Sequence, residues 1–258
     1  MQIIKTEEEI DILRVNADIV SRALALVAEN IKPGVTTRFL DGLAEEYIRD
    51  NGAEPGFLGY QGFPNTLCIS LNDAVVHGIP SDYQLKEGDI VSVDCGTRYK
   101  GYYGDSAYTF GVGELSSQVS KLLRVTKESL YQGIEHAVEG SRIGDIGHAV
   151  QEHAEKNGFS VVRELVGHGL GASMHEKPEV PNYGARGRGM KLKSGMVLCI
   201  EPMVNLGTKQ VYQDKDGWTI KTYDNQPSAH FELTVVVRKG KAETLSTFKY
   251  IEEVYKFV

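Results

Sequence analysis

Residues 85–94 read LKEGDIVSVD and residues 192–201 read LKSGMVLCIE, and this pair of stretches decides the fold. Each begins with Leu-Lys, places a glycine where a turn is expected, and continues as an apolar run typical of a buried strand. Each strand is then expected to end on a carboxylate, Asp94 in the first stretch and Glu201 in the second. Similar segments far apart in one chain predict an internal duplication.

Two further pairs of segments repeat in the same order. Residues 34–52 and 140–158 both begin and end with glycine around one helical stripe, and His77–Pro80 and His175–Pro178 share the pattern His-x-x-Pro. A single match of this kind arises easily by chance, but three in the same order do not. We therefore expect two similar halves, about 1–112 and 113–258, facing each other across a pseudo-twofold axis.

Helices are expected between the repeated strands. Thr6 to Glu9 fits a capping box, and apolar residues at helical spacing continue from there until Pro33-Gly34. The same spacing predicts further helices over residues 40–52, 119–137 and 146–154. Strand-like runs follow Asp105 and Glu232, so each half brings a second carboxylate to a β-rich segment.

Four acids and one histidine are the candidate metal ligands: Asp94, Asp105, His168, Glu201 and Glu232. Carboxylates can bridge two divalent cations, and such a pair activates a shared water near neutral pH. An acid buried beside an apolar strand is costly unless a cation or hydrogen bonds neutralise it. Taken alone, each acid also fits a surface turn or a helix cap. The duplication favours metal binding because it orders the acids together.

Several short motifs, taken as a set, resemble those of type I methionine aminopeptidases of the short bacterial type. They are His77-Gly-Ile-Pro80, Asp94-Cys95-Gly96 with Asp105, Gly167-His168-Gly169-Leu170-Gly171 with His175-Glu176-Lys177-Pro178, Glu201-Pro202, and Glu232-Leu233-Thr234. The resemblance covers nearly the whole chain. It implies an α+β protein with the pita-bread (creatinase/aminopeptidase) fold, in which helices flank a central antiparallel sheet and a dinuclear site lies between the halves.

The resemblance also implies a role for each candidate residue. Asp94 binds one metal, His168 binds the other, Asp105 and Glu232 bridge them, and Glu201 is both a ligand and a proton shuttle. A metal-bridging hydroxide attacks the first peptide bond. His77 contacts the scissile nitrogen and His175 the developing oxyanion. The metals expected from the ligand set are two divalent ions of Co, Mn, Fe or Zn.

The expected substrate is the N-terminal Met of nascent polypeptides with a small second residue. Its pocket is placed by the resemblance at Tyr60, Phe63, Cys68 and Trp218, although Cys68 also fits a plain core cysteine. Two positions depart from the usual pattern. Met174 stands where an aromatic residue is frequent, and His230 stands where Gln is usual.

Composition limits the other classes of function. The chain has 258 residues, 41% hydrophobic and 24% charged, with a net charge of -7, three widely spaced cysteines and no secretory signal pattern. These features predict a single-domain cytoplasmic protein with reduced cysteines, no membrane segment and no dedicated nucleic-acid binding. Residues 209–221 carry three lysines, Lys209, Lys215 and Lys221. These lysines could make a transient contact with the ribosome, although a solvated loop is the simpler interpretation.

Two alternatives stay open. The first is an X-Pro aminopeptidase or prolidase, which shares these ligands but carries a large extra N-terminal domain, whereas here few residues precede His77. The second is a pita-bread binding protein that has lost catalysis. The second is disfavoured because such a protein loses ligands, and all five candidates are present.

Overall fold

The computed structural model describes residues 3–256, so residues 1, 2, 257 and 258 of the expected 1–258 domain lie outside it. The helices are α1 (Glu7–Glu29), α2 (Thr37–Asp50), α3 (Ser117–Glu135), α4 (Ile143–Lys156), α5 (Lys249–Val254) and a 3-10 turn, η1 (Tyr60–Gly62). In the first half the strands are β1 (Glu54–Pro55), β2 (Leu67–Leu71), β3 (Ala74–Val76), β4 (Ile90–Tyr99) and β5 (Tyr102–Gly111). In the second half they are β6 (Ser160–Val161), β7 (Gly167–Gly169), β8 (Glu176–Val180), β9 (Val197–Ile200), β10 (Met203–Asn205), β11 (Val211–Gln213), β12 (Ile220–Thr222), β13 (Ser228–His230), β14 (Leu233–Val236) and β15 (Glu243–Thr244).

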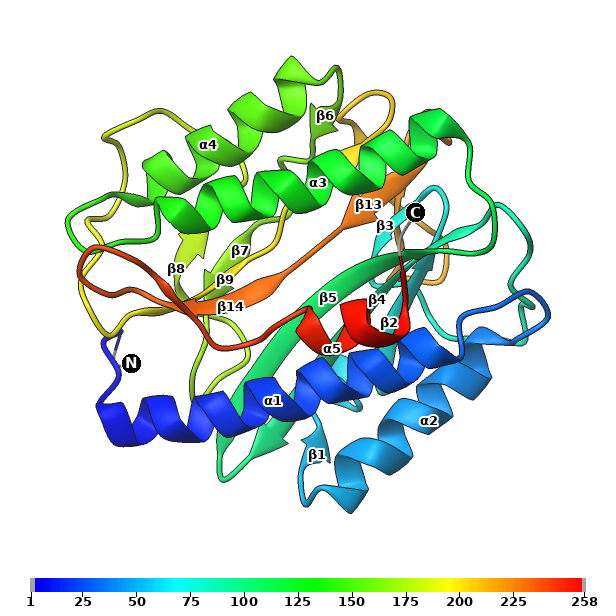
Figure 1. Ribbon diagram of the computed structural model, residues 1–258, viewed down its shortest axis with the longest axis horizontal. Helices are drawn as coiled ribbons and strands as arrows, with labels where there is room; N and C mark the ends of the chain where they lie inside the picture. The colour runs from blue at the N-terminus through cyan, green and yellow to red at the C-terminus, as the bar shows by residue number, and fades with distance from the viewer. Residues whose placement is uncertain (1–2, 257–258) are drawn as a thin grey trace.

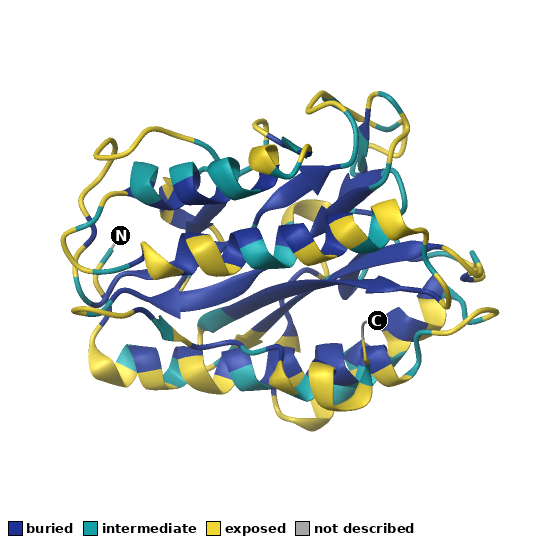
Figure 2. Cartoon of the chain, turned by 45° about the horizontal axis from the view of Figure 1, so that its top comes forward, coloured by how far each residue is buried: buried dark blue, intermediate teal, exposed yellow. Residues whose placement is uncertain are grey.

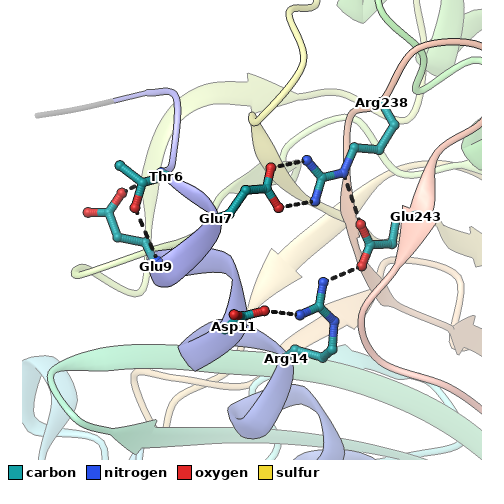
Figure 3. Close-up of polar contacts among 7 residues, drawn as sticks. All are labelled: Thr6, Glu7, Glu9, Asp11, Arg14, Arg238 and Glu243. Atoms are coloured by element: carbon teal, nitrogen blue, oxygen red, sulfur yellow. Dashed lines mark hydrogen bonds and ion pairs between the residues drawn. The ribbon is translucent and has the colours of Figure 1, made fainter.

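The expected helices form, with small differences at their ends. The capping box of α1 is present: Thr6 Oγ1 accepts the Glu9 N–H at 3.3 Å, and Glu9 Oε2 accepts the Thr6 N–H at 2.7 Å (Figure 3). Helix α3 stops at Glu135, so Ala137, which the pattern included, lies just beyond it. No helix within residues 3–256 is long and apolar enough to cross a membrane.

Two antiparallel sheets form the centre of the molecule. In the first, β4 pairs with β1, β2 and β5; in the second, the order is β15-β14-β9-β7-β8. They meet where Ala107 of β5 pairs with Glu232, whose N–H donates to the Ala107 carbonyl at 2.9 Å. Helices α1 and α2 pack against strands of the first sheet, and α3 and α4 pack against strands of the second half, including β9 and β8 (Figure 1).

One apolar core runs through both halves. It includes Leu24 of α1, Val93 of β4, Leu130 of α3 and Ile200 of β9, each almost fully buried. The central strands are buried along most of their length, while the helices expose one face to solvent (Figure 2). This packing holds the two sheets in a fixed relation where their acidic residues meet.

The prediction that both repeated strands end on a carboxylate is right for Glu201 and wrong for Asp94. Strand β9 stops at Ile200, and Pro202 two residues later has no N–H to extend the pairing. Strand β4 instead continues through Asp94 to Tyr99, because it forms a long hairpin with β5. Lys100 and Gly101 make the tight turn of that hairpin, with φ of 49° and 82°.

Candidate metal centre and active site

The register of the first sheet sets the direction of its acids. Asp94 of β4 lies directly opposite Cys68 of β2 and Ala107 of β5. Residues directly opposite each other share a face, and side chains alternate along a strand, so Asp105, two residues before Ala107, lies on the same face. This face therefore carries Cys68, Asp94 and Asp105 together.

The second sheet repeats the arrangement. Cys199 of β9 lies opposite His168 of β7 and Thr234 of β14. Glu201 comes two residues after Cys199 and Glu232 two residues before Thr234, so the same alternation gives all of them one face. The pairing of Ala107 with Glu232 then joins this face to that of the first sheet.

The five predicted ligands meet in one cavity of about 330 Å³. His168 Nε2 lies 3.5 Å from Glu201 Oε1 and 3.7 Å from Asp105 Oδ2. Possible ligand atoms of Asp105, His168 and Glu232, with the thiol of Cys199, all lie within 4.8 Å of one another. Asp94 lines the same cavity. The structure thus brings together residues that are far apart in the sequence.

Burial of so many acids in one place disfavours their charged forms. Desolvation, followed by the charges of neighbouring carboxylates, raises the pKa of Asp105, Glu201 and Glu232 well above the ordinary range. Desolvation also raises the pKa of Asp94 to about 6. The same burial, helped by His175, lowers the pKa of His168 to about 3, which leaves its imidazole neutral and able to bind a cation.

The cluster also contains buried oxygen atoms that make no hydrogen bond within the described residues. They are Asp94 Oδ1, Asp105 Oδ1 and Glu232 Oε1. An unpaired buried polar atom is costly and is rare in folded proteins. Oxygen donors with one imidazole suit divalent ions, so these residues fit the expected metals.

Histidines line the cavity beside the acids. His77 adopts a positive φ of 60°, and its pKa is lowered to about 4, first by burial and then by His230 and His175. His175 Nδ1 lies 2.9 Å from the Tyr60 hydroxyl, and its ring centroid is 4.4 Å from that of His168. Both expected histidines therefore face the acids from different elements, His77 from a loop and His175 from the residue before β8.

The predicted methionine pocket forms the apolar part of the same cavity. Tyr60, Phe63, Cys68 and Trp218 all line it, and the rings of Phe63 and Trp218 meet edge to face at 5.2 Å. Cys68 is buried, and burial together with Asp94 raises the pKa of its thiol well above the ordinary value. Cys68 is thus both a core residue and a wall of the cavity.

Sequence reasoning missed several residues of the site. The further lining residues are Phe57, Gln61, Val76, Glu164, Leu165, Val166 and Met203, whereas the sequence itself singles out His230, which also lines the cavity. Cys199 was missed as well, although its place two residues before Glu201 in an alternating strand was a usable signal. Phe57 carried no such signal, since it lies in an irregular segment.

The two departures from the usual family pattern occupy different surroundings. Met174 is fully buried and packs behind the cavity, in the same apolar cluster as Phe57. His230 lies in the cavity wall, with its Nε2 buried, 3.6 Å from Glu201 Oε2 and without a hydrogen-bond partner among the described residues. Met174 can therefore act only through its neighbours, whereas His230 faces the acids directly.

The chain is similar to known metallopeptidases along most of its length. The model of metallopeptidase family M24 matches residues 11–239. The chain is 51% identical to the methionine aminopeptidase of Clostridium perfringens, over 96% of this chain and 100% of that protein. It is 48% identical to methionine aminopeptidase 1 of Bacillus subtilis, over 95% and 99%.

The chain is also similar to solved structures of enzymes. The methionine aminopeptidase of Rickettsia prowazekii superposes with a TM-score of 0.94 at 40% identity, covering 96% of this chain and 100% of that one. The prolidase of Pyrococcus furiosus superposes with a TM-score of 0.76 at 25% identity, and the match covers 95% of this chain but 65% of that one. The fold is therefore shared with both kinds of enzyme, while the length and identity favour the first.

Proposed function

The chain belongs to metallopeptidase family M24, and we propose that it is a metal-dependent aminopeptidase that removes the N-terminal methionine from newly made polypeptides. The observation that carries this function is near full-length similarity to methionine aminopeptidases in a chain whose five candidate ligands share one cavity. The pita-bread fold, which the chain shares with a solved methionine aminopeptidase and a solved prolidase, supports the same conclusion.

The metal ligands in this proposal are Asp94, Asp105, His168, Glu201 and Glu232, holding two divalent ions of Mn, Fe, Co or Zn. Such ions, when bound, polarise a peptide carbonyl and lower the pKa of a water molecule. The unpaired oxygens of Asp94, Asp105 and Glu232 support the assignment, because a cation would satisfy them.

Proton transfer is assigned to Glu201. This carboxylate would take a proton from the attacking water and give it to the leaving amine. In the metal-free cluster, burial and the charge of Asp94 raise the pKa of Glu201 above the ordinary range, which makes this carboxylate a stronger base. We assign the transition-state contacts to the neutral imidazoles of His77 and His175, His77 to the scissile nitrogen and His175 to the carbonyl oxygen.

The methionine side chain would occupy the apolar part of the cavity. Phe63 and Trp218 offer aromatic faces and edges to a thioether, and Tyr60 and Cys68 complete the wall. In this arrangement the acids and histidines would surround the first peptide bond of a polypeptide with a small second residue.

Nascent chains are the proposed source of the substrate, which places the activity in the cytoplasm and near the ribosome. Of the three lysines considered for a ribosome contact, Lys221 is already paired, with its Nζ 3.0 Å from Asp73 Oδ2. We therefore assign any such contact to Lys209 and Lys215.

Peptide hydrolysis tests the proposal. Metal-free protein and protein loaded with Mn²⁺ or Co²⁺ would be assayed for release of Met from Met-Ala-Ser and of Ala from an Ala-Pro peptide. We expect Met release only with metal, no cleavage before proline, and a loss of at least about 100-fold in kcat in Glu201→Gln. Faster cleavage of the Ala-Pro peptide would favour the prolidase alternative, and no cleavage of either peptide would favour a binding protein.

A further inference from the structure

A buried ion pair joins the start of the chain to the loop that carries His175. Lys5 Nζ lies 2.7 Å from Glu176 Oε2, and the two side chains are only 5% and 3% exposed. The partners are 171 positions apart in the sequence. Most ion pairs of this protein lie at the surface, where such pairs contribute little. A fully buried pair needs a different explanation.

The Glu176 carboxylate also organises the loop in front of it. Its Oε1 accepts the backbone N–H of Ser173 at 3.1 Å, while the Gly171 N–H donates to the Ser173 carbonyl at 3.3 Å. The pair lies directly against Gly171: a Cβ there would come within 2.5 Å of Lys5 Nζ and 2.6 Å of Glu176 Oε1. Glycine at this position therefore allows the ion pair to reach the loop backbone.

The lysine is itself held firmly in place. Its backbone N–H donates to the Gly195 carbonyl at 2.8 Å, and the preceding residue, Ile4, pairs with Met196. On its other side Thr6 caps α1, so the backbone is fixed both before and after Lys5. The ammonium group thus reaches the loop from an anchored segment.

The His175 imidazole contacts Tyr60 and His168 within the cavity, and its backbone belongs to the loop that Glu176 holds. Side chains alternate here between inside and outside, so Met174 and Glu176 are buried while His175 is exposed to the cleft. The buried neighbour Glu176 is therefore the fixed point in the backbone next to the imidazole.

We propose that Lys5 and Glu176 are positioning residues for His175: their ion pair fixes the backbone of residues 171–176 so that the imidazole meets the substrate carbonyl. The inference rests on the proposed function, in which His175 contacts that oxygen. A displacement of about 1 Å in such a group can cost on the order of 100-fold in rate.

Four variants separate positioning from stability. Lys5→Met and Glu176→Gln each remove one partner, and the double variant removes both. The matched control is Glu7→Gln, which breaks the exposed pair between Glu7 and Arg238 in the same N-terminal region (Figure 3). Each metal-loaded variant would be measured for melting temperature and for kcat and KM with Met-Ala-Ser.

In Lys5→Met the melting temperature should fall because the buried Glu176 carboxylate is left without its partner. The double variant should recover much of the lost melting temperature, because neither charge remains. We expect kcat to fall about 10- to 100-fold in both single variants and to stay low in the double variant, with KM changed less than about threefold. Recovery of kcat together with stability in the double variant, or wild-type kcat in both single variants, would overturn the proposal.

An NMR measurement keeps this test separate from the proposed function. The imidazole cross-peak of His175, assigned with His175→Gln, should shift or broaden in the Lys5 and Glu176 variants and stay in place in Glu7→Gln. If the wild-type protein released no methionine, the proposed function would fail while this cross-peak still reported on positioning. An unchanged cross-peak in Lys5→Met would overturn the inference alone.

Discussion

Metal binding to the acidic cluster should release protons. Without metal, burial and mutual repulsion raise the pKa of Asp105, Glu201 and Glu232 well above the ordinary range, and burial raises that of Asp94 to about 6. Carboxyls with raised pKa values hold their protons to a higher pH than ordinary acids do, and a cation that binds must displace the protons that remain. We expect on the order of one to three protons to leave for each protein molecule that is fully loaded.

The sign and size of the pH dependence follow from this displacement. Protons compete with the metal, so the apparent affinity should rise with pH, by about tenfold per pH unit for each proton released. His168 adds nothing to the effect near neutrality, because its pKa of about 3 leaves it already neutral. The rise should flatten once pH exceeds the raised pKa values of the acids.

Isothermal titration calorimetry with Mn²⁺ gives the measurement. Titrations in buffers of different ionisation enthalpy, repeated at several pH values, yield the number of protons released. Glu164→Gln, at the cavity wall but outside the ligand set, is the control and should behave like the wild-type protein. A binding heat that does not depend on the buffer, with an affinity that is flat across neutral pH, would refute the reasoning.

Three further predictions follow from single residues. Burial and the charges of Glu201 and Asp94 raise the pKa of the Glu232 carboxyl, so its charged form is disfavoured in the metal-free protein; Glu232→Gln should therefore leave the melting temperature of the metal-free protein unchanged or higher while abolishing full metal loading by calorimetry. The pKa of His77 is lowered from 6.5 to about 4, so between these pH values the unfolded chain binds a proton at this residue and the native protein does not. The free energy of unfolding should therefore fall by up to about 3 kcal/mol as the pH is lowered from 6.5 to about 4. His77→Asn, which tolerates the positive φ, should flatten that part of a urea-denaturation pH series, and an unchanged slope would contradict the pKa shift. Trp218→Ala should raise KM for Met-Ala-Ser about tenfold, since an aromatic wall of the pocket is lost, and an effect on kcat alone would argue against the pocket assignment.

Local sequence patterns were enough to place most elements. The capping box at Thr6 and the apolar stripes predicted helices that the structure confirms, because caps and helical spacing act over a few residues. Motif similarity pointed to the acids and histidines, and these residues do share a cavity. The sequence was therefore sufficient to predict the fold class and the enzyme family.

The sequence by itself determined the residue types of the site and the face of the strand on which each one lies, since alternation is a local property of the chain. Only the tertiary structure decided which faces meet. In the folded protein β4 continues beyond Asp94 as part of a hairpin with β5. Phe57 lines the cavity, and Lys5 forms an ion pair with Glu176. Contacts of this kind depend on how distant segments pack. A short-range pattern cannot encode a contact between two side chains that are as far apart in the sequence as Lys5 and Glu176.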